Sequence, residues 1–256
     1  MKYPKKLSVQ TTILTPDGRA EATESLAVEQ KFTVLLNERE IADSMLLPAG
    51  LEEFGPGFLF GLGYITGPEE IKETWVCHQG RISVLADIPD NRELQGRPIF
   101  SGCEGGGRIS ETMLEKAFGP LHEADITFSE IRKFLAAFSV YSRLGSQTHC
   151  IHSCGFWAGG EMTAFYEDIS HNNAVDKIIG AILLGRFPPT GTLYTTGRLM
   201  SDTMLKCARI GIPIVMSRTA PSSLGLTIAR KAGVTLAAYA RPGRLNVFHR
   251  PDRIKI

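Results

Sequence analysis

The chain has 256 residues, of which 43% are hydrophobic and 21% are charged, the composition of a soluble globular protein with one large or two smaller domains. Its 28 Lys and Arg residues balance 27 Asp and Glu residues to a net charge of +1, which argues against a nucleic-acid-binding or membrane-surface protein. The basic start lacks the apolar stretch of a signal peptide, and the longest apolar run, 178–184, is far shorter than the roughly 20 residues of a membrane helix.

The first half of the chain has the pattern of mixed α and β structure. Residues 31–37 and 81–87 have the β-branched and aliphatic content of strands. Between them, residues 51–65 are apolar but interrupted by glycines. A helix is predicted at 110–118.

One cysteine, Cys103, stands in a loop of four glycines at 101–107. Glycine tolerates positive φ and lacks Cβ, so this stretch is not the interior of a helix or strand. Backbone N–H groups and solvent reach a sulfur in such a loop, which is the setting of a reactive thiol. The alternative is a turn in which the cysteine has no chemical role. The five cysteines of the chain form no disulfide framework, so we expect a reducing, cytoplasmic setting.

The second half alternates strands and helices. A capping-box spacing at Thr127 and Glu130 predicts a helix that runs to about Leu144. Further helices are predicted at 173–184, 201–210 and 222–232, with Ser201 as the cap of the second, and strands at 150–157, 161–167, 192–198, 213–217, 235–240 and 245–249. This alternation predicts a layered α/β domain over residues 122–256, preceded by a smaller α+β region over 1–121.

Cys150, His152 and Cys154 have the residue types of a metal site. On an extended strand the two cysteines would be about 13 Å apart, which is too far for one ion or a disulfide. No metal site is therefore predicted, unless this segment forms a tight loop. Cys77 and Cys207 are interpreted as packing residues.

Residues 167–177 end a strand and open a helix with many polar side chains. One interpretation is a helix N-terminus, where Asn and Asp cap free N–H groups. The other is the floor of a site that presents donors and acceptors to a ligand. The two remain open on the sequence alone.

Three strand ends carry arginines beside hydroxyl-rich helix starts or turns. Arg198 precedes Ser201, Arg218 precedes Ser222, and residues 239–246 link the last two strands. Helix N-termini and guanidinium groups suit phosphate, and sites in layered α/β sheets form where strand ends meet helix starts. The alternative for 239–246 is an ordinary solvated hairpin. No Walker A or dinucleotide-binding fingerprint occurs.

In these motifs the chain resembles the FdhD family over nearly its whole length. The resemblance lies in Thr148 to His152, in 167–177, in 196–201 with Lys206, in 220–224 and in 240–244, and earlier in the glycine-rich stretch 52–59.

The resemblance implies a sulfurtransferase with a C-terminal three-layer, cytidine-deaminase-like domain, which forms a homodimer. It implies that Cys103 accepts sulfur as a persulfide from a cysteine desulfurase. The sulfur then passes to the molybdenum bis(molybdopterin guanine dinucleotide) cofactor, a bound substrate, before this is inserted into formate dehydrogenase. The residues that the resemblance assigns to cofactor binding are His152, Asn173, Asp176, Lys177, Arg198, Arg218, Tyr239, Ala240, Arg241, Pro242, Gly243 and Arg244.

The chain departs from the family pattern at two places. The family loop resembles Cys-Gly-x-Cys-Gly, and here Gly106 stands where the second cysteine is usual. Ser170, His171 and Asn172 replace the family's Gly-Arg-His. These departures motivate an alternative, a divergent module that binds or delivers the cofactor without moving sulfur. A zinc hydrolase is a third hypothesis, but the His-x-Glu and Pro-Cys-x-x-Cys motifs are missing.

Overall fold

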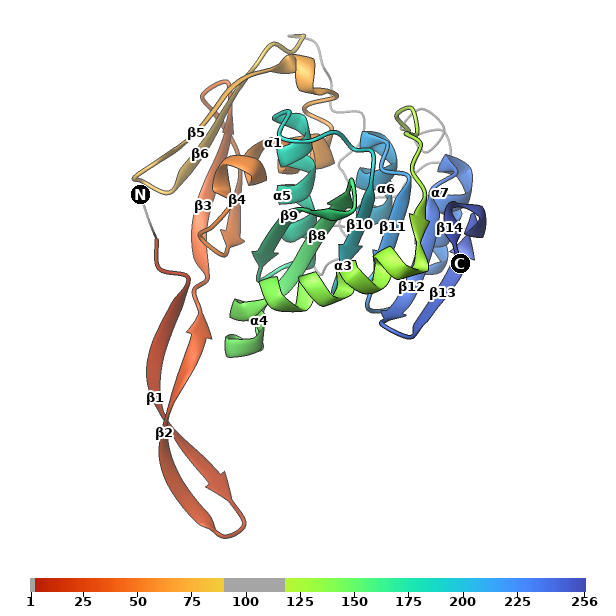
Figure 1. Ribbon diagram of the computed structural model, residues 1–256. Helices are drawn as coiled ribbons and strands as arrows, with labels where there is room; N and C mark the ends of the chain where they lie inside the picture. The colour runs from red at the N-terminus through yellow and green to blue at the C-terminus, as the bar shows by residue number, and fades with distance from the viewer. Residues whose placement is uncertain (1–2, 90–117) are drawn as a thin grey trace.

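The computed structural model describes residues 3–89 and 118–256 (Figure 1). Cys103, Gly106 and nearly all of the helix predicted at 110–118 lie outside the described residues. Among the helices described, none combines the length and apolarity needed to cross a membrane.

The first part of the chain builds two separate sheets. The hairpin of β1 (Lys6–Thr15) and β2 (Gly18–Ala27) stands apart from the rest of the molecule (Figure 1). The second sheet has the order β4-β3-β6-β5, and its strands are β3 (Gln30–Leu36), β4 (Arg39–Leu46), β5 (Ile71–Cys77) and β6 (Arg81–Ala86). The strands predicted at 31–37 and 81–87 are therefore confirmed.

Helix α1 (Leu51–Leu62) is formed by the glycine-rich apolar stretch. Phe54 and Leu59 pack with Phe32, Val34 and Ile82 of the four-stranded sheet, and burial of these side chains supplies the core of this part.

The second part of the chain forms a six-stranded sheet of order β13-β12-β11-β10-β8-β9. Its strands are β8 (His152–Ala158), β9 (Glu161–Asp168), β10 (Thr192–Thr195), β11 (Ile214–Ser217), β12 (Thr235–Arg241) and β13 (Arg244–His249). The pairs β10–β11 and β11–β12 are parallel, and the other pairs are antiparallel. All six strands match strands predicted from the sequence, although β10 ends at Thr195 rather than at 198.

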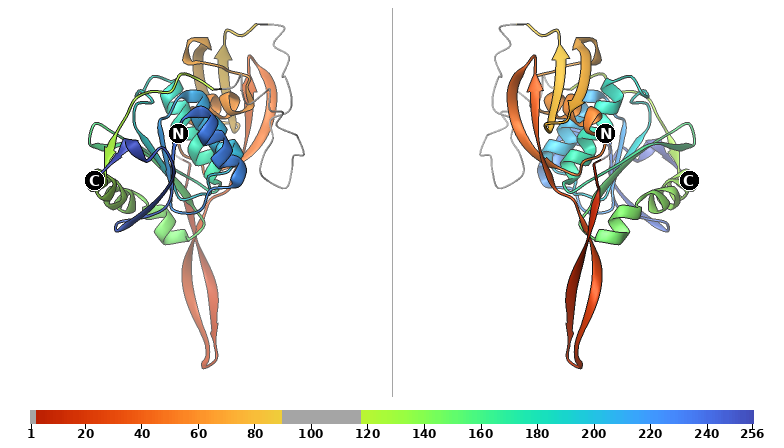
Figure 2. Two further views of the ribbon diagram at one scale, coloured as in Figure 1. Left: turned by 90° about the vertical axis from the view of Figure 1, so that its right-hand side faces the viewer. Right: turned by 90° about the vertical axis from the view of Figure 1, so that its left-hand side faces the viewer.

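Helices cover both faces of this sheet (Figures 1 and 2). Along β10, Leu193 faces α5 (His171–Leu183), α6 (Ser201–Ile210) and α7 (Ser223–Ala232), while Tyr194 faces α3 (Phe128–Tyr141) on the other side. This alternation follows from the two-residue period of a strand. The predicted α/β class is confirmed. The cytidine-deaminase-like relationship and the boundary between 121 and 122 stay predictions.

Short elements complete the second part. Helix α4 (Arg143–Thr148) follows α3, and β7 (Ile126–Thr127) pairs in parallel with β14 (Ile254–Lys255) near the end of the chain.

Helices α1 and α5 touch through glycines. A Cβ on Gly57 would lie 1.8 Å from the carbonyl oxygen of Asp176, and a Cβ on Gly180 would lie 1.7 Å from that of Glu53. Because no side chain fits at either position, the two backbones approach each other directly. This contact joins the first part of the chain to the helix layer of the second.

Most helix ends follow the predicted signals. Thr127 and Glu130 form a complete capping box at the start of α3, and Gly211 and Gly233 end α6 and α7 in the left-handed conformation. The assignment of Ser201 as a cap is wrong. Met200 occupies the N-cap position without a side-chain hydrogen bond, because Ser201 already belongs to the first helical turn.

Candidate functional site

Four of the predicted site residues, His152, Arg198, Arg218 and Arg241, lie at one edge of the six-stranded sheet. Parallel strands β10, β11 and β12 end at this edge, where they are followed by Arg198 and Arg218 and closed by Arg241. Strand β8 runs antiparallel to β10, so its first residue, His152, lies at the same edge. The sheet topology thus brings together residues that are up to 89 positions apart, as expected for sites of layered α/β proteins.

The arginines at this edge are exposed. Two hydrogen bonds fix the side chain of Arg241: its Nη1 donates to the carbonyl oxygens of Arg218 and Ala240, both at 2.8 Å. No side chain within 3–89 and 118–256 pairs with the guanidinium of Arg198 or Arg218. Burial raises the pKa of the Tyr194 phenol, and the charges of Arg218 and Arg241 oppose this shift, so both cations lie close to it.

The β12–β13 turn is an exposed hairpin. Tyr239 adopts a positive φ of 54° beside an irregularity in the strand register, and its N–H donates to the carbonyl oxygen of Thr219 at 3.1 Å. Arg244 donates through Nε to Asn246 Oδ1 at 3.2 Å, and Pro242 and Gly243 form the exposed tip. Arg241 and Tyr239 therefore contact the neighbouring strand end, whereas 242–244 extend beyond it.

Hydroxyl groups tie the strand ends to one another. Ser217 Oγ and Thr219 Oγ1 donate to the carbonyl oxygen of Gly197 at 2.5 and 2.8 Å, and Ser217 Oγ accepts from the Thr219 N–H at 2.9 Å. Thr195 Oγ1 accepts from the Gly197 N–H at 3.1 Å. These hydroxyls are thus used within the protein, where they fix the turns that carry Arg198 and Arg218.

Two histidines lie side by side near Arg198. The ring centroids of His152 and His171 are 5.5 Å apart, and Nδ1 of His152 lies 3.2 Å from Thr196 Oγ1. Burial lowers the pKa of both rings, and the charge of Arg198 lowers each further. Both histidines are therefore neutral at pH 7. The Nε2 atom of His171 is buried and has no hydrogen-bond partner within the described residues.

Three predicted ligand residues, Asn173, Asp176 and Lys177, belong to a polar network at the start of α5. Lys177 has no exposed surface, and its Nζ donates to Asp168 Oδ2 at 2.5 Å. Asp176 accepts from Lys206 Nζ at 2.7 Å, and Asn173 Nδ2 donates to Asp168 Oδ1 at 2.9 Å. In this arrangement these side chains position the start of α5. Asp176 and Lys177 are buried and have no contact surface for a ligand, whereas Asn173 is half-buried. Their assignment to cofactor binding stays a prediction.

Burial has opposite effects on the two charges of this network. It raises the pKa of Asp176 and lowers the pKa of Lys177, since desolvation disfavours either charged form. The partner cation Lys206 and the partner anion Asp168 counter these shifts.

Asp202 is a site residue that the sequence analysis did not single out. It accepts from Asn172 Nδ2 at 2.6 Å and from the Thr203 N–H at 2.8 Å. These bonds join the first turn of α5 to the first turn of α6, behind the histidine pair. An acidic residue in the first helical turn is the sequence signal that marks this position.

Cys150 and Cys154 differ in burial. Cys154 lies in the core with a pKa raised by burial, while Cys150 is exposed just before the strand begins. Within the part of the chain that the structure describes, no group of three or more His, Cys, Asp or Glu is arranged to hold a metal ion.

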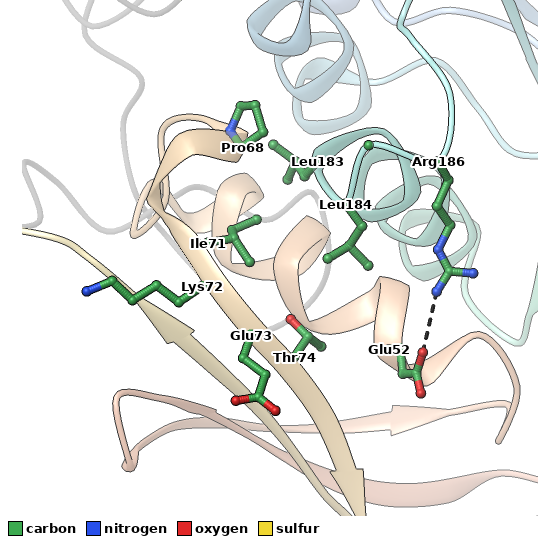
Figure 3. Close-up of a pocket in the computed structure, with 10 residues that line it drawn as sticks. Glu52, Pro68, Ile71, Lys72, Glu73, Thr74, Leu183, Leu184 and Arg186 are labelled. Carbon is green, nitrogen blue, oxygen red and sulfur yellow. Dashed lines mark hydrogen bonds and ion pairs between the residues drawn. The ribbon is translucent and has the colours of Figure 1, made fainter.

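A pocket of about 530 Å³ lies away from this edge, between β5 and the end of α5 (Figure 3). Glu52 and Arg186 form an ion pair on its wall at 3.4 Å, and Ile71 and Leu184 supply apolar surface. None of the residues predicted for the site lines it.

Comparisons with known proteins agree with one another. The sequence model of the FdhD/NarQ family matches residues 27–255. A protein named sulfur carrier protein FdhD from Staphylococcus haemolyticus is 28% identical, with 97% of each chain covered. Its namesake from Sulfolobus acidocaldarius is 30% identical over 94% of this chain and 95% of its own.

A solved structure shares both the sequence and the fold. The crystal structure of a protein described as a formate dehydrogenase accessory protein, from Desulfotalea psychrophila, is 48% identical. It matches with a TM-score of 0.87 over 98% of this chain and 100% of its own.

Proposed function

This chain belongs to the FdhD/NarQ family, and on that premise we propose that it is a sulfur carrier in the maturation of formate dehydrogenase. The names of its relatives and the accessory role of the solved structure support this assignment. The observation that carries it furthest within the described residues is the row of exposed arginines at the strand-end edge. The proposed setting is the cytoplasm, with a cysteine desulfurase as sulfur donor and formate dehydrogenase as the protein served. The helices on both faces of the six-stranded sheet support a cytidine-deaminase-like layered domain.

Cys103 is the proposed carrier of sulfur. In the loading step its thiolate attacks the terminal sulfur of a desulfurase persulfide. A new S–S bond forms at Cys103, the S–S bond of the donor breaks, and the donor cysteine leaves as a thiolate. In the delivery step an acceptor attacks the terminal sulfur, and the Cys103 thiolate leaves. Oxidation states balance in both steps, because the sulfane sulfur moves as a unit between nucleophiles.

The strand-end edge is the proposed binding surface for the cofactor that receives this sulfur. A bis(molybdopterin guanine dinucleotide) cofactor carries several phosphates, which are bound well by guanidinium groups. Arg198, Arg218 and Arg241 supply three such groups, and the hydroxyl network holds the turns of the first two in place. The neutral His152 and His171 add hydrogen-bonding groups without changing the charge of the surface.

Sulfur loading tests the carrier role directly. The protein is incubated with a cysteine desulfurase and cysteine, and its intact mass is measured before and after treatment with a reductant. We expect a reducible gain of one sulfur atom that disappears in Cys103→Ser and persists in Cys150→Ser. A gain that persists in Cys103→Ser would refute the assignment of Cys103.

Guanine nucleotide binding tests the surface separately. With GDP as the probe, Arg218→Gln and Arg241→Gln are each expected to weaken binding by about 10- to 100-fold, the value of a hydrogen bond to a charged group. The matched control is Arg19→Gln, because Arg19 is exposed on the hairpin β1–β2, away from this edge. Equal affinities for all three variants would place the nucleotide elsewhere.

A binding or delivery module without sulfur transfer is the second candidate. The glycine at position 106, where the family pattern has a second cysteine, favours it. Such a module would bind GDP with the same dependence on Arg218 and Arg241 but would acquire no sulfur. The two experiments together therefore distinguish a carrier from a binder.

A further inference from the structure

One wall of the pocket between β5 and the end of α5 is the edge of a strand. Four consecutive residues of β5, Ile71 to Thr74, line the pocket, together with 183–186 and Glu52 (Figure 3). Successive side chains of a strand point to opposite faces of its sheet, so four consecutive residues line one pocket only along the edge of the strand. The pocket therefore opens onto the backbone of β5.

The edge of β5 at the pocket is open. In the sheet order β4-β3-β6-β5 this strand comes last, and it pairs with β6 on one side. Among residues 3–89 and 118–256, no strand pairs with its other side. An edge strand has a row of unpaired N–H and C=O groups, which bind an extended peptide when its backbone lies alongside.

The irregular start of β5 limits this pairing to a short segment. The register with β6 is irregular between Ile71 and Glu73 and regular from Glu73 to Cys77. Bulges and charged side chains restrict pairing at the edges of natural sheets. A partner strand of about five residues gives a contact below roughly 1,200 Å², the size of a weak and transient interface.

One polar atom on this wall has no partner. Oγ1 of Thr74 is buried, and it has no hydrogen-bond partner within the part of the chain that the structure describes. A buried hydroxyl without a partner costs free energy, so it needs an explanation. A polar group of a ligand in the pocket would supply the missing hydrogen bond.

Acidic side chains outnumber basic ones around the pocket. The acidic residues on its wall or next to it are Glu52, Glu53, Glu69, Glu70, Glu73 and Asp87, and the basic ones are Lys72 and Arg186. Both basic side chains are already paired. Lys72 pairs with Asp87 at 3.2 Å, and Arg186 Nη1 pairs with Glu53 Oε1 at 2.6 Å. The excess of negative charge attracts a cationic ligand.

The shape and chemistry of the pocket fit a lysine or arginine side chain. Glu52 is 59% exposed, and its contact with Arg186 is 3.4 Å long, so its carboxylate has capacity for a further donor. Ile71 and Leu184 supply apolar surface from opposite walls. Lysine and arginine combine an aliphatic stem with a charged end, which matches an apolar middle beside a carboxylate.

Charge argues against a second copy of the chain as the occupant. Pairing of β5 with β5 of another copy would bring two acidic surroundings together, and like charges across an interface disfavour association. A partner of opposite charge suits this edge.

We propose that the open edge of β5 and the adjoining pocket dock an extended, basic segment of a partner protein. The segment adds a strand to the four-stranded sheet and places one lysine or arginine between Ile71 and Leu184, with its charged end at Glu52. Backbone pairing supplies affinity, and the pocket supplies the preference for a basic side chain. None of the residues assigned to sulfur transfer or cofactor binding lines this surface, so the inference is independent of the proposed function.

A capped, fluorescent hexapeptide of alternating valine and arginine is the probe, and its binding to the full chain is followed by fluorescence anisotropy. We expect a Kd of about 1–100 µM, as for a weak contact, which rises with salt. A matched peptide of valine and glutamate should bind at least about 10-fold more weakly. Free arginine in about 100-fold excess should not displace the probe, because it has the cation without a backbone to pair.

Backbone pairing is tested with the same hexapeptide methylated at every backbone nitrogen. This form keeps the side chains and the charge but donates no backbone hydrogen bond. We expect it to bind at least about 10-fold more weakly. Equal affinity of the two forms would refute the addition of a strand.

Variants of the chain locate the site. Glu52→Gln and Glu73→Gln should each weaken binding of the valine–arginine peptide about fivefold, as for a partly exposed ion pair. The matched control is Glu24→Gln on the hairpin β1–β2, which should change the Kd less than about twofold. Thr74→Val keeps the shape of the side chain and removes the hydroxyl, so it should weaken binding about two- to tenfold without lowering stability in urea.

Amide hydrogen exchange gives an independent readout of the same site. Bound peptide should slow exchange within 71–77 and leave 6–27 unchanged. Absence of binding, equal effects of Glu52→Gln and Glu24→Gln, or protection outside β5 and the pocket would each overturn the proposal. Self-association of the chain that the peptide displaces would identify a second copy as the occupant and refute the basic partner.

Discussion

Replacing Lys177 with Met is expected to lower the free energy of unfolding by about 3–5 kcal/mol, the cost of leaving one member of a buried ion pair without its partner. Lys177 Nζ bonds to Asp168 Oδ2 at 2.5 Å, to the Glu167 carbonyl oxygen at 3.0 Å and to the Leu47 carbonyl oxygen at 3.3 Å. Both charged side chains are 0% exposed. Methionine has nearly the length of lysine, so the loss of packing volume is small and the uncompensated Asp168 carboxylate dominates.

Urea unfolding followed by fluorescence measures this change. The control is Lys72→Met, because Lys72 forms a surface ion pair with Asp87 at 3.2 Å, with side-chain exposures of 57 and 76%. Such pairs contribute about 0–1 kcal/mol. Asp168→Asn alone and combined with Lys177→Met completes a double-mutant cycle, in which a coupling energy of about 1–3 kcal/mol is expected.

The same variant distinguishes two roles for Lys177. If this lysine contacts the cofactor directly, as the resemblance implies, Lys177→Met weakens GDP binding and leaves the stability of the protein unchanged. If it instead holds the start of α5, Lys177→Met lowers the free energy of unfolding. A Lys177→Met protein within about 1 kcal/mol of the unaltered protein, with a coupling energy near zero, would refute the structural role.

Three further predictions concern the helix contact, the histidines and the hydroxyl network. Gly180→Ala should destabilise the protein by at least about 2 kcal/mol in urea unfolding, because its Cβ would lie 1.7 Å from the Glu53 carbonyl oxygen; an effect below about 0.5 kcal/mol would mean that α1 and α5 separate freely. The half-buried His152 and His171 have a folded pKa below the ordinary value of 6.5, so the unfolded chain binds more protons and stability falls as pH drops from about 7 through this window. His171→Asn should flatten that fall between about pH 7 and 5.5, and a slope that instead matches that of His149→Asn, an exposed control, would contradict the assignment. Ser217→Ala should cost about 1–3 kcal/mol and also weaken GDP binding, since it removes the bond to Gly197 that holds the Arg198 turn; unchanged binding in isothermal titration would separate the two effects.

Local signals in the sequence predicted most of the second half of the chain. Helix ends depend on hydrogen bonds to neighbouring backbone groups, so they can be predicted from the local sequence. This holds for the capping box at Thr127 and Glu130 and for the terminal glycines Gly211 and Gly233. Parallel strand ends meet at one edge in any such sheet, so the sequence alone predicts that the arginine turns share one surface.

The sequence did not predict that Asp176 and Lys177 are buried. The apolar stripe of Val175, Ile178 and Ile182 predicts a helix with one buried face, on which polar neighbours are solvated. In the structure α5 lies between the sheet and α1, and every residue from 174 to 183 is buried. Polar residues of that helix consequently face protein on all sides, and only the presence of Asp168 and Lys206 makes this possible.

The hairpin β1–β2 was also missed, although its signals are present. Pro16 and Asp17 form the turn, followed by Gly18, between segments in which Leu7, Val9, Thr11 and Ile13 recur at every second position. An alternating pattern predicts a strand with one buried face, but it does not tell where the covering surface comes from. Among residues 3–89 and 118–256, no other strand pairs with this hairpin.

At the strand-end edge, hydroxyl groups bind the protein backbone while guanidinium groups are exposed to solvent, and this determines which ligands the edge can bind. Ser217, Thr219 and Thr195 use their hydroxyls on the protein backbone, so these groups have little capacity left for a neutral ligand. The exposed guanidinium groups of Arg198 and Arg218 retain theirs, whereas Nη1 of Arg241 is used on two carbonyl oxygens, and guanidinium groups act only as donors. Affinity at this edge is therefore expected to follow the number of phosphate charges on the ligand, from guanosine to GMP to GDP, and to weaken as salt rises. Equal affinity for guanosine and GDP would show that the base is recognised instead, and the arginines would then have to act elsewhere in the sulfur transfer.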